Sequence, residues 1–131
     1  MDIEFRALVV EDEPAVRELT ARALAARGFQ CTKARDGKEA LVHLDETSYD
    51  VVVSDFRMPN LNGHRLVYEI SRREDRPVVV VVTGVIDPGL VGSVLNSGAD
   101  DIMFKPVDYA VLAVKVRFLV EQRRARDLVQ S

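Results

Sequence analysis

The sequence predicts one α/β domain built on a parallel β-sheet. Five short apolar runs alternate with five segments whose apolar residues recur at helical spacing, which is the pattern of repeated βα units. The chain has 131 residues, the length of one ordinary domain, and no repeat or linker-like stretch interrupts it. Repeated βα units imply right-handed crossovers that place helices on both faces of the sheet.

The expected strands are short and mostly apolar, as strands covered on both faces should be. They are residues 7–10, 29–33, 51–53, 78–82 and 102–104. The third and fourth consist only of valine, whose β-branched side chain favours extended backbone.

The first three expected helices carry clear start signals or apolar stripes. Pro14 suits a first helical turn, Gly28 can close that helix, and Asp36 is a good N-cap for the second. The apolar stripes that we expect to be buried are Val16, Leu19, Ala23 and Leu24, then Ala40, Leu41 and Leu44, then Leu66, Val67 and Ile70.

The sequences of the last two expected helices differ in how strongly they favour a helix. Residues 87–97 form a poor helix sequence because Pro88, Gly89 and Gly92 weaken it, and we expect this element to be the most mobile. The final helix is expected from about Asp108 to the mid-120s. Its expected core-facing residues are Leu112, Ala113, Val116, Leu119 and Val120.

Composition narrows the class of protein. Apolar residues make up 47% and the net charge is −3, so neither a membrane nor a nucleic acid is expected as a direct partner. The longest apolar run, residues 78–82, is too short to span a bilayer. Cys31 is the only cysteine, which favours a reducing cytoplasm. His43 and His64 lack metal-ligand spacing, and we expect them to be exposed to solvent.

The residues that carry chemistry come directly after the strands. Glu11 and Asp12 follow the first strand, Asp55 the third, Thr83 the fourth and Lys105 the fifth. Functional groups of open parallel sheets gather at the carboxyl ends of the strands. We therefore expect three carboxylates, one hydroxyl and one ammonium to converge on one edge.

This set of groups predicts an aspartyl phosphate site. Three neighbouring carboxylates repel one another unless a cation intervenes, and hard oxygen ligands favour Mg²⁺ or Mn²⁺. Lys105 would add positive charge and Thr83 a hydrogen-bond donor. A carboxylate nucleophile beside a metal and a lysine is the arrangement that forms an acyl phosphate.

In order and spacing, these residues resemble the receiver domain of two-component response regulators. The resemblance covers roughly residues 5 to 120 and implies a flavodoxin-like, doubly wound five-stranded sheet of order 2-1-3-4-5 in a three-layer α/β/α fold. The residues that carry it are Glu11-Asp12-Glu13-Pro14, Asp55-Phe56-Arg57-Met58-Pro59 with Asn62-Gly63, Thr83-Gly84 and Lys105-Pro106.

The resemblance also implies roles for single residues. Asp55 would accept a phosphoryl group from a phosphohistidine on a sensor histidine kinase or a histidine phosphotransfer protein. Asp12, Asp55 and the backbone carbonyl of Arg57 would bind the metal directly, and Glu11 would bind it through water. Such a domain is a switch that assists its own phosphorylation and dephosphorylation, not a turnover enzyme.

Three further positions would transmit the signal. Lys105 would pair with Asp55 and then with the phosphoryl group, while Thr83 would swing to bond a phosphoryl oxygen. The output would lie on the face made by the fourth helix, the fifth strand and the fifth helix. Ile102 departs from the family pattern, which has an aromatic residue there, so the usual coupling of ring and threonine is in question.

Three alternatives remain from other classes. A haloacid-dehalogenase-like phosphatase needs a second aspartate two residues after the nucleophile, where this chain has Arg57. A flavodoxin-like FMN module needs a phosphate-binding loop after the first strand, where Glu11-Asp12-Glu13 would repel phosphate. A non-phosphorylated pseudo-receiver that acts as a protein-interaction module is opposed by the complete acidic pocket but kept open by Ile102.

The C-terminal segment has two readings. We expect residues 1–122 to form the receiver domain and residues 123–131 a helix extension or the start of a linker. The Arg123-Arg124-Ala125-Arg126 cluster fits a solvated helix end, where cations oppose the helix dipole, equally with a helix leading to an output domain. Homodimerisation is also left open.

Overall fold

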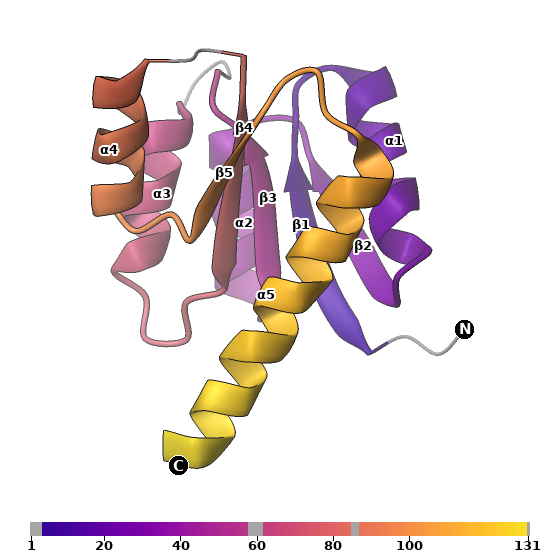
Figure 1. Ribbon diagram of the computed structural model, residues 1–131, viewed down its shortest axis with the longest axis vertical. Coiled ribbons are helices and arrows are strands. Elements are labelled where there is room, and N and C mark those ends of the chain that lie inside the picture. Colours follow the sequence, from indigo (N-terminus) through magenta and orange to yellow (C-terminus); the bar gives the residue numbers. More distant parts are fainter. Residues whose placement is uncertain (1–3, 58–61, 85–86, 131) are drawn as a thin grey trace.

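The computed structural model describes residues 4–57, 62–84 and 87–130, so Met58 and Pro59 of the family motif lie outside the described residues. Strands and helices alternate along the chain (Figure 1). They are β1 (Phe5–Val10), α1 (Pro14–Ala25), β2 (Phe29–Ala34), α2 (Gly37–Glu46), β3 (Val51–Asp55), α3 (Gly63–Ser71), β4 (Val78–Thr83), α4 (Pro88–Asn96), β5 (Asp101–Phe104) and α5 (Tyr109–Gln130).

The sheet has five strands in the order β2-β1-β3-β4-β5, and every neighbouring pair is parallel. The predicted doubly wound, flavodoxin-like fold is therefore confirmed. The direction in which successive strands are added to the sheet reverses between β1 and β3. Open α/β sheets place their functional groups at this position.

Helices cover both faces of the sheet in three layers (Figure 1). The strand side chains alternate between the two faces: Ala7 and Val9 pack with α1 and α5, while Leu8 and Val10 pack with α2, α3 and α4. β4 is buried along its whole length, and its side chains alternate between the same two faces. This double burial explains why the central strands are runs of valine.

Most helices begin at a polar cap. The Asp36 carboxylate accepts a hydrogen bond from the Glu39 amide at 2.8 Å, and the Asp108 carboxylate accepts one from Ala110 at 3.0 Å. Asn62 and Asp87 cap α3 and α4 in the same way. α4 thus forms a regular helix despite its glycines, and its expected mobility stays a prediction.

The predicted stripe of α1 was wrong at one position. Leu19 is 46% exposed, whereas Thr20 and Ala21 are buried. The Thr20 hydroxyl donates to the Val16 carbonyl at 2.8 Å, so burial leaves it hydrogen-bonded. Helical spacing alone did not predict whether the face with Leu19 or the neighbouring face with Thr20 would be buried.

The histidines also differ from expectation, since both are half-buried. His64 lies 2.7 Å from the Ser97 hydroxyl and so connects α3 to the end of α4.

The last helix is longer than predicted and continues to Gln130. Its second half is held to the amino end of the sheet by ion pairs, Arg123 with Asp100 at 3.1 Å and Arg124 with Asp50 at 2.9 Å. These pairs give the arginine cluster contacts within the domain, while the predicted boundary at residue 122 stays a prediction. Across the described residues, no helix combines the length and apolar character needed to cross a bilayer.

Candidate functional site

The carboxyl ends of four strands carry the candidate site, at the upper edge of the sheet in Figure 1. Glu11 follows β1 directly, Asp55 ends β3, Thr83 ends β4 and Lys105 follows β5. Glu11 and Thr83 are buried, with 4% and 3% of their surface exposed. These are the positions at which the sequence placed the convergent polar groups.

The acidic groups and the lysine lie within contact distance of one another. Lys105 Nζ is 3.3 Å from Asp55 Oδ2 and 3.7 Å from Glu11 Oε1. One carboxylate oxygen from each of Glu11, Asp12 and Asp55 lies within 4.8 Å of the others. The Asp55 side chain is 10% exposed, so its carboxylate is sheltered yet reachable from solvent.

Backbone hydrogen bonds between neighbouring strands set these positions. The Glu11 amide donates to the Ala34 carbonyl at 3.0 Å, and the Lys105 amide donates to the Thr83 carbonyl at 2.9 Å. Glu11 and Lys105 are therefore fixed by the same ladder that builds the sheet. A site on strand ends is held more rigidly than one on a free loop.

The segment after Asp55 is held by a close backbone contact with α3. The Gly63 amide donates to the Phe56 carbonyl at 2.8 Å. A Cβ at Gly63 would lie 2.7 Å from Phe56 Cα, closer than real Cβ atoms approach. Glycine at this position thus allows α3 to start against the segment that carries the candidate nucleophile.

The acidic cluster shifts the protonation of Glu11. Burial, a hydrogen bond with Asp12 and the charge of Asp55 raise its pKa from 4.5 to about 7. The Glu13 amide, which donates to Glu11 Oε2 at 3.3 Å, and the Lys105 ammonium act in the opposite direction. The Glu11 carboxyl is thus partly protonated near neutral pH.

The same carboxylates also shift the pKa of the Lys105 ammonium. Partial burial lowers the pKa of its ammonium, but the charges of Asp55 and Glu11 outweigh this, and its pKa is raised above 10.5. The side chain is therefore a cation at neutral pH, placed directly beside the Asp55 carboxylate.

The chemistry of the donor set fits a hard divalent cation. Glu11, Asp12 and Asp55 supply carboxylate oxygens, the ligands that Mg²⁺ prefers. Asp12 is exposed, so one side of the cluster is open to water and to a ligand. A cation here would offset the charge of Asp55, which adds to the effect of burial in raising the pKa of Glu11.

A small cleft opens beside the candidate nucleophile. It has a volume of about 320 Å³ and is lined by Asp55, Arg57, Thr83, Gly84 and Lys105. The Arg57 residue is exposed, and Thr83 lies at the inner wall. The cleft combines the Lys105 cation and the Thr83 hydroxyl, which suits an anion the size of phosphate.

Ile102 lies apart from this cleft. It is half-buried on β5 and packs against the apolar cluster beneath α3 and α4. The structure therefore makes it a core contact of the α4 side of the sheet.

One supporting residue was not singled out from the sequence. The Arg17 guanidinium donates to the Glu11 carbonyl at 2.9 Å. Glu13, which belongs to the acidic motif after β1, adds to the negative charge that raises the pKa of Lys105.

Known proteins resemble this chain in sequence. A family described as the response regulator receiver domain matches residues 7–117. The chain is 36% identical over 121 residues to the sensor histidine kinase RcsC of Escherichia coli, covering 92% of this chain and 13% of that protein. It is 34% identical over 124 residues to the DNA-binding transcriptional regulator NtrC of Salmonella typhimurium, covering 92% and 26%. The chain thus spans about a quarter or less of these relatives.

Solved structures have the same fold. The receiver domain of the Francisella response regulator 1452 superposes with a TM-score of 0.86 at 28% identity, covering 92% of this chain and 99% of that one. The signal receiver domain of a signal transduction histidine kinase from Syntrophus aciditrophicus gives 0.83 at 33% identity, covering 91% and 92%.

Proposed function

Because this chain belongs to the response regulator receiver domain family, we propose that it is a phosphoacceptor switch that takes a phosphoryl group from a phosphohistidine onto Asp55. The observation that carries this proposal is the Lys105 ammonium 3.3 Å from the Asp55 carboxylate, inside a cluster of three acids. The neighbouring positive charge keeps this carboxylate ionised, as a nucleophile must be, and offsets the negative charge of an incoming phosphoryl group.

The transfer conserves atoms and charge. An Asp55 carboxylate oxygen forms a bond to phosphorus, while the bond between phosphorus and the donor imidazole nitrogen breaks and its electron pair stays on that nitrogen. Lys105, raised in pKa, remains protonated and neutralises charge that moves onto the phosphoryl oxygens. Hydrolysis of the acyl phosphate by water returns the Asp55 carboxylate and inorganic phosphate.

Mg²⁺, or Mn²⁺, is the proposed cofactor. Asp12, Asp55 and the Arg57 carbonyl would bind it directly and Glu11 through water. When bound, the ion supplies positive charge that offsets the three carboxylates and the incoming phosphate. The carboxylate oxygens of Asp12 and Glu11, within 4.8 Å of an Asp55 oxygen, support this assignment.

Phosphorylation would be read out through Thr83 and the face of α4, β5 and α5. Thr83 lines the same cleft as Asp55, so a short movement of its hydroxyl would bring it to a phosphoryl oxygen. Ile102 packs beneath α4 and offers no aromatic ring to rotate, so we infer that the shift passes through backbone movement of β5 and α4. The domain acts as a switch in this scheme and not as a turnover enzyme.

The proposed partner is a sensor histidine kinase or a histidine phosphotransfer protein in a reducing cytoplasm. Relatives that carry similar sequences include a sensor histidine kinase and a transcriptional regulator, which supports a place in two-component signalling. An output domain or a separate target protein would receive the signal.

Intact-mass spectrometry tests the proposal. The protein is incubated with acetyl phosphate, with and without Mg²⁺, as wild type and as Asp55→Asn. We expect a magnesium-dependent gain of one phosphoryl group that Asp55→Asn abolishes. Asp50→Asn is the matched control, since Asp50 lies at the opposite end of β3 in an ion pair with Arg124.

Failure would have a defined meaning. If no condition adds a phosphoryl group to the folded wild type, the chain is a pseudo-receiver that acts by binding partners. If Asp55→Asn still gains the group, the acceptor is a different residue.

A further inference from the structure

A cavity lies on the α1 side of the sheet, under the segment that joins β5 to α5 (Figure 1). It has a volume of about 310 Å³, and its lining includes Val16 of α1 and Val107 of the joining segment. This cavity is distinct from the cleft that holds Thr83, although Asp55 and Lys105 line both. The phosphoryl chemistry proposed above uses the cleft and leaves the cavity without a role.

The interior of the cavity is apolar. Buried side chains from β1, β3, β4 and α5 line it, namely Val9, Val53, Val82 and Leu112. Val16 and Val107, both half-buried, add further apolar surface. Thr20 also lines the cavity, but its hydroxyl already donates to the Val16 carbonyl at 2.8 Å and is therefore satisfied. The interior thus suits an apolar group better than a polar one.

The end of the cavity nearest the nucleophile is acidic. Glu11, Glu13 and Asp55 line this end together with Lys105. Lys105 Nζ lies 3.3 Å from Asp55 and 3.7 Å from Glu11, so those two acids share its charge. Glu13 is exposed and adds negative charge near Lys105. A divalent ion in the acidic cluster would, with Lys105, offset the other acids and leave the charge of Glu13 unbalanced. This end of the cavity therefore attracts a cation and repels an anion.

Hydrogen bonds to the backbone hold both sides of the cavity. On the α1 side, the Arg17 guanidinium donates to the Glu11 carbonyl at 2.9 Å. On the other side, the Lys105 amide donates to the Thr83 carbonyl at 2.9 Å. A ligand would thus enter a site that is already formed, which lowers the cost of binding.

We propose that this cavity binds a small organic cation, a molecule with an aromatic or branched apolar body and one ammonium group. The body would lie against Val16 and Val107, and the ammonium would pair with the Glu13 carboxylate. The volume is at the lower end of the range for ligand pockets, about 300–1,000 Å³, so the body would consist of about one or two rings. Binding would not require phosphorylation of Asp55 and is independent of the function proposed above.

Three indole derivatives that share a ring system but differ in charge test the proposal: tryptamine, 3-ethylindole and indole-3-acetate. Isothermal titration calorimetry measures their affinities for the whole chain, with and without excess Mg²⁺. We expect tryptamine to bind about tenfold more tightly than indole-3-acetate, with 3-ethylindole between them, because Glu13 attracts an ammonium and repels a carboxylate. Mg²⁺ should leave this order unchanged, because the ion would occupy the acidic cluster and not the cavity.

A substitution that fills the cavity tests its location. Val16→Phe should abolish binding of both tryptamine and 3-ethylindole, because the added ring takes the space of the ligand. Val42→Phe is the matched control, since Val42 is 55% exposed on α2. Circular dichroism checks that each variant is folded.

A change of charge tests the cationic end of the ligand. Glu13→Gln should weaken tryptamine binding by about threefold and leave 3-ethylindole binding unchanged, as expected for an exposed ion pair. Glu46→Gln, which removes an exposed acid at the end of α2, should affect neither probe.

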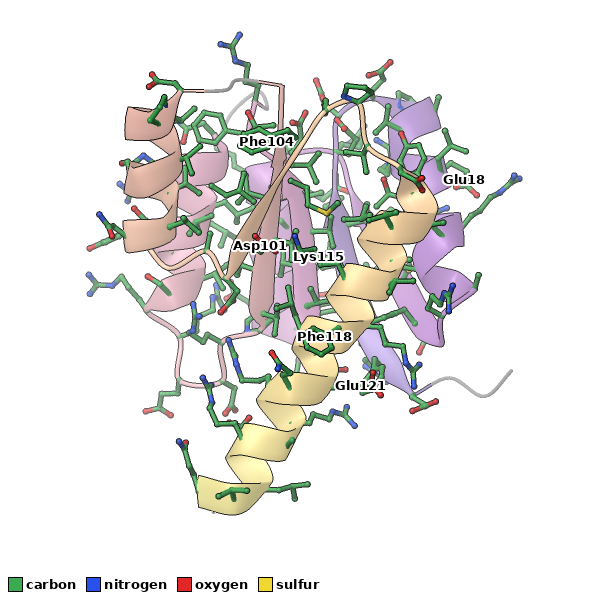
Figure 2. All side chains as sticks on the ribbon, in the orientation of Figure 1. Glu18, Asp101, Phe104, Lys115, Phe118 and Glu121 are labelled. Atoms are coloured by element: carbon green, nitrogen blue, oxygen red, sulfur yellow. The ribbon has the colours of Figure 1, made fainter. Side chains whose placement is uncertain are left out.

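Nuclear magnetic resonance locates the probe in the wild type, so this test holds even if Val16→Phe does not fold. Tryptamine should shift the backbone amide signals of Thr20, Val107 and Leu112, which line the cavity. The amide signal of Phe118 should stay unchanged, because Phe118 lies on the outer side of α5 (Figure 2) and is 56% exposed.

Four results would contradict the proposal. A folded wild type that binds neither tryptamine nor 3-ethylindole up to their solubility limits has no ligand site here. Equal binding by Val16→Phe and Val42→Phe, or shifts at Phe118 in place of Val107, puts the probe on another surface. Equal affinities for tryptamine and indole-3-acetate exclude a cationic ligand. Loss of tryptamine binding in Mg²⁺ means that the amine replaces the metal ion.

Discussion

Glu11 carries a carboxyl group whose protonation depends on the residues that surround Asp55. Its pKa of about 7 lies above the value of 4.5 for an ordinary glutamate. A group with a raised pKa binds its proton more tightly in the folded state, so the stability it contributes is fully present below pH 4.5. That contribution is lost as the pH rises through 7.

The first prediction concerns the pH dependence of stability without metal. In EDTA, the Glu11 contribution to the unfolding free energy should decline by about 3 kcal/mol between pH 4.5 and pH 8. Glu11→Gln should lack this decline and so be more stable than wild type at pH 8. Urea denaturation at both pH values measures the difference, and parallel pH profiles for the two proteins would contradict the assignment.

A second prediction concerns divalent cations. Mg²⁺ should raise the unfolding free energy of the wild type, and more strongly at pH 8 than at pH 6, because metal ligands must be deprotonated. Asp12→Ala should remove the effect. Asp45→Ala, which removes an exposed acid of α2 that pairs with Arg73, should keep it. Equal stabilisation of both variants would place the ion elsewhere.

A third prediction concerns Arg57, whose exposed side chain lines the mouth of the cleft. Arg57→Ala should change the rate at which the phosphorylated domain loses phosphate, because Arg57 lines the cleft beside Asp55. The decay of the phosphorylated mass after removal of the donor measures this rate. Equal dephosphorylation rates for wild type and Arg57→Ala would show that the Arg57 side chain does not affect the loss of phosphate.

Among the secondary-structure elements, α3 and α4 use glycine for different purposes. Gly63 lies against the Phe56 backbone, whereas a Cβ at Gly92 would meet no atom within 4 Å. Gly92 therefore costs helix stability without a packing reason, and this cost is the basis on which we expect α4 to be mobile.

A pair of alanine substitutions tests this contrast. Gly63→Ala should lower the unfolding free energy by about 1–3 kcal/mol, because the backbone must move to admit the Cβ. Gly92→Ala should raise it by about 0.5–1 kcal/mol by favouring the helix. Thermal unfolding measures both. Hydrogen exchange of α4 amides, slower in Gly92→Ala, would also test the expected mobility of that helix.

Strands and site positions were predictable because they depend on simple patterns. Doubly buried strands need unbroken apolar runs, and the polar residue that ends each run must lie at the sheet edge, as Asp55 and Thr83 do. The inner face of α1 was less predictable. Leu19 and Thr20 are adjacent on the helix, and only tertiary packing decided that the smaller threonine, with its hydroxyl bonded to Val16, faces the core.

Long-range pairs were beyond prediction from sequence. The end of α5 depends on ion pairs with residues 23 and 74 positions earlier, Arg123 with Asp100 and Arg124 with Asp50. No local pattern links these residues. The link between His64 and Ser97 was missed for the same reason, since it joins two helices across 33 positions.

At the scale of the whole molecule, Asp100 joins three parts of the fold at the end of the sheet opposite the site. Its carboxylate accepts hydrogen bonds from the Val79 amide at 2.8 Å, from Arg76 at 3.2 Å and from Arg123 at 3.1 Å. The Asp100 carboxylate therefore joins three parts of the fold through hydrogen bonds: β4, the segment before β4, and α5.

Asp100→Ala should lower the unfolding free energy by about 2–4 kcal/mol, because one amide and two guanidinium groups lose a charged acceptor. Asp127→Ala, which removes an exposed partner of Arg126, should change stability little. Chemical denaturation compares the two. A similar small effect for both would mean that water replaces the Asp100 carboxylate without cost.

α5 begins a few residues after Lys105 and runs past the opposite end of the sheet, over 22 residues or about 33 Å (Figure 1). Its amino end is therefore attached to the loop that carries Lys105, beside the nucleophile. A tilt of about 5° at that attachment would move the far tip by about 3 Å over this length. An event at the Asp55 carboxylate that tilted α5 would thus be detectable at the far end of the helix, where Arg123 and Arg124 pair with Asp100 and Asp50.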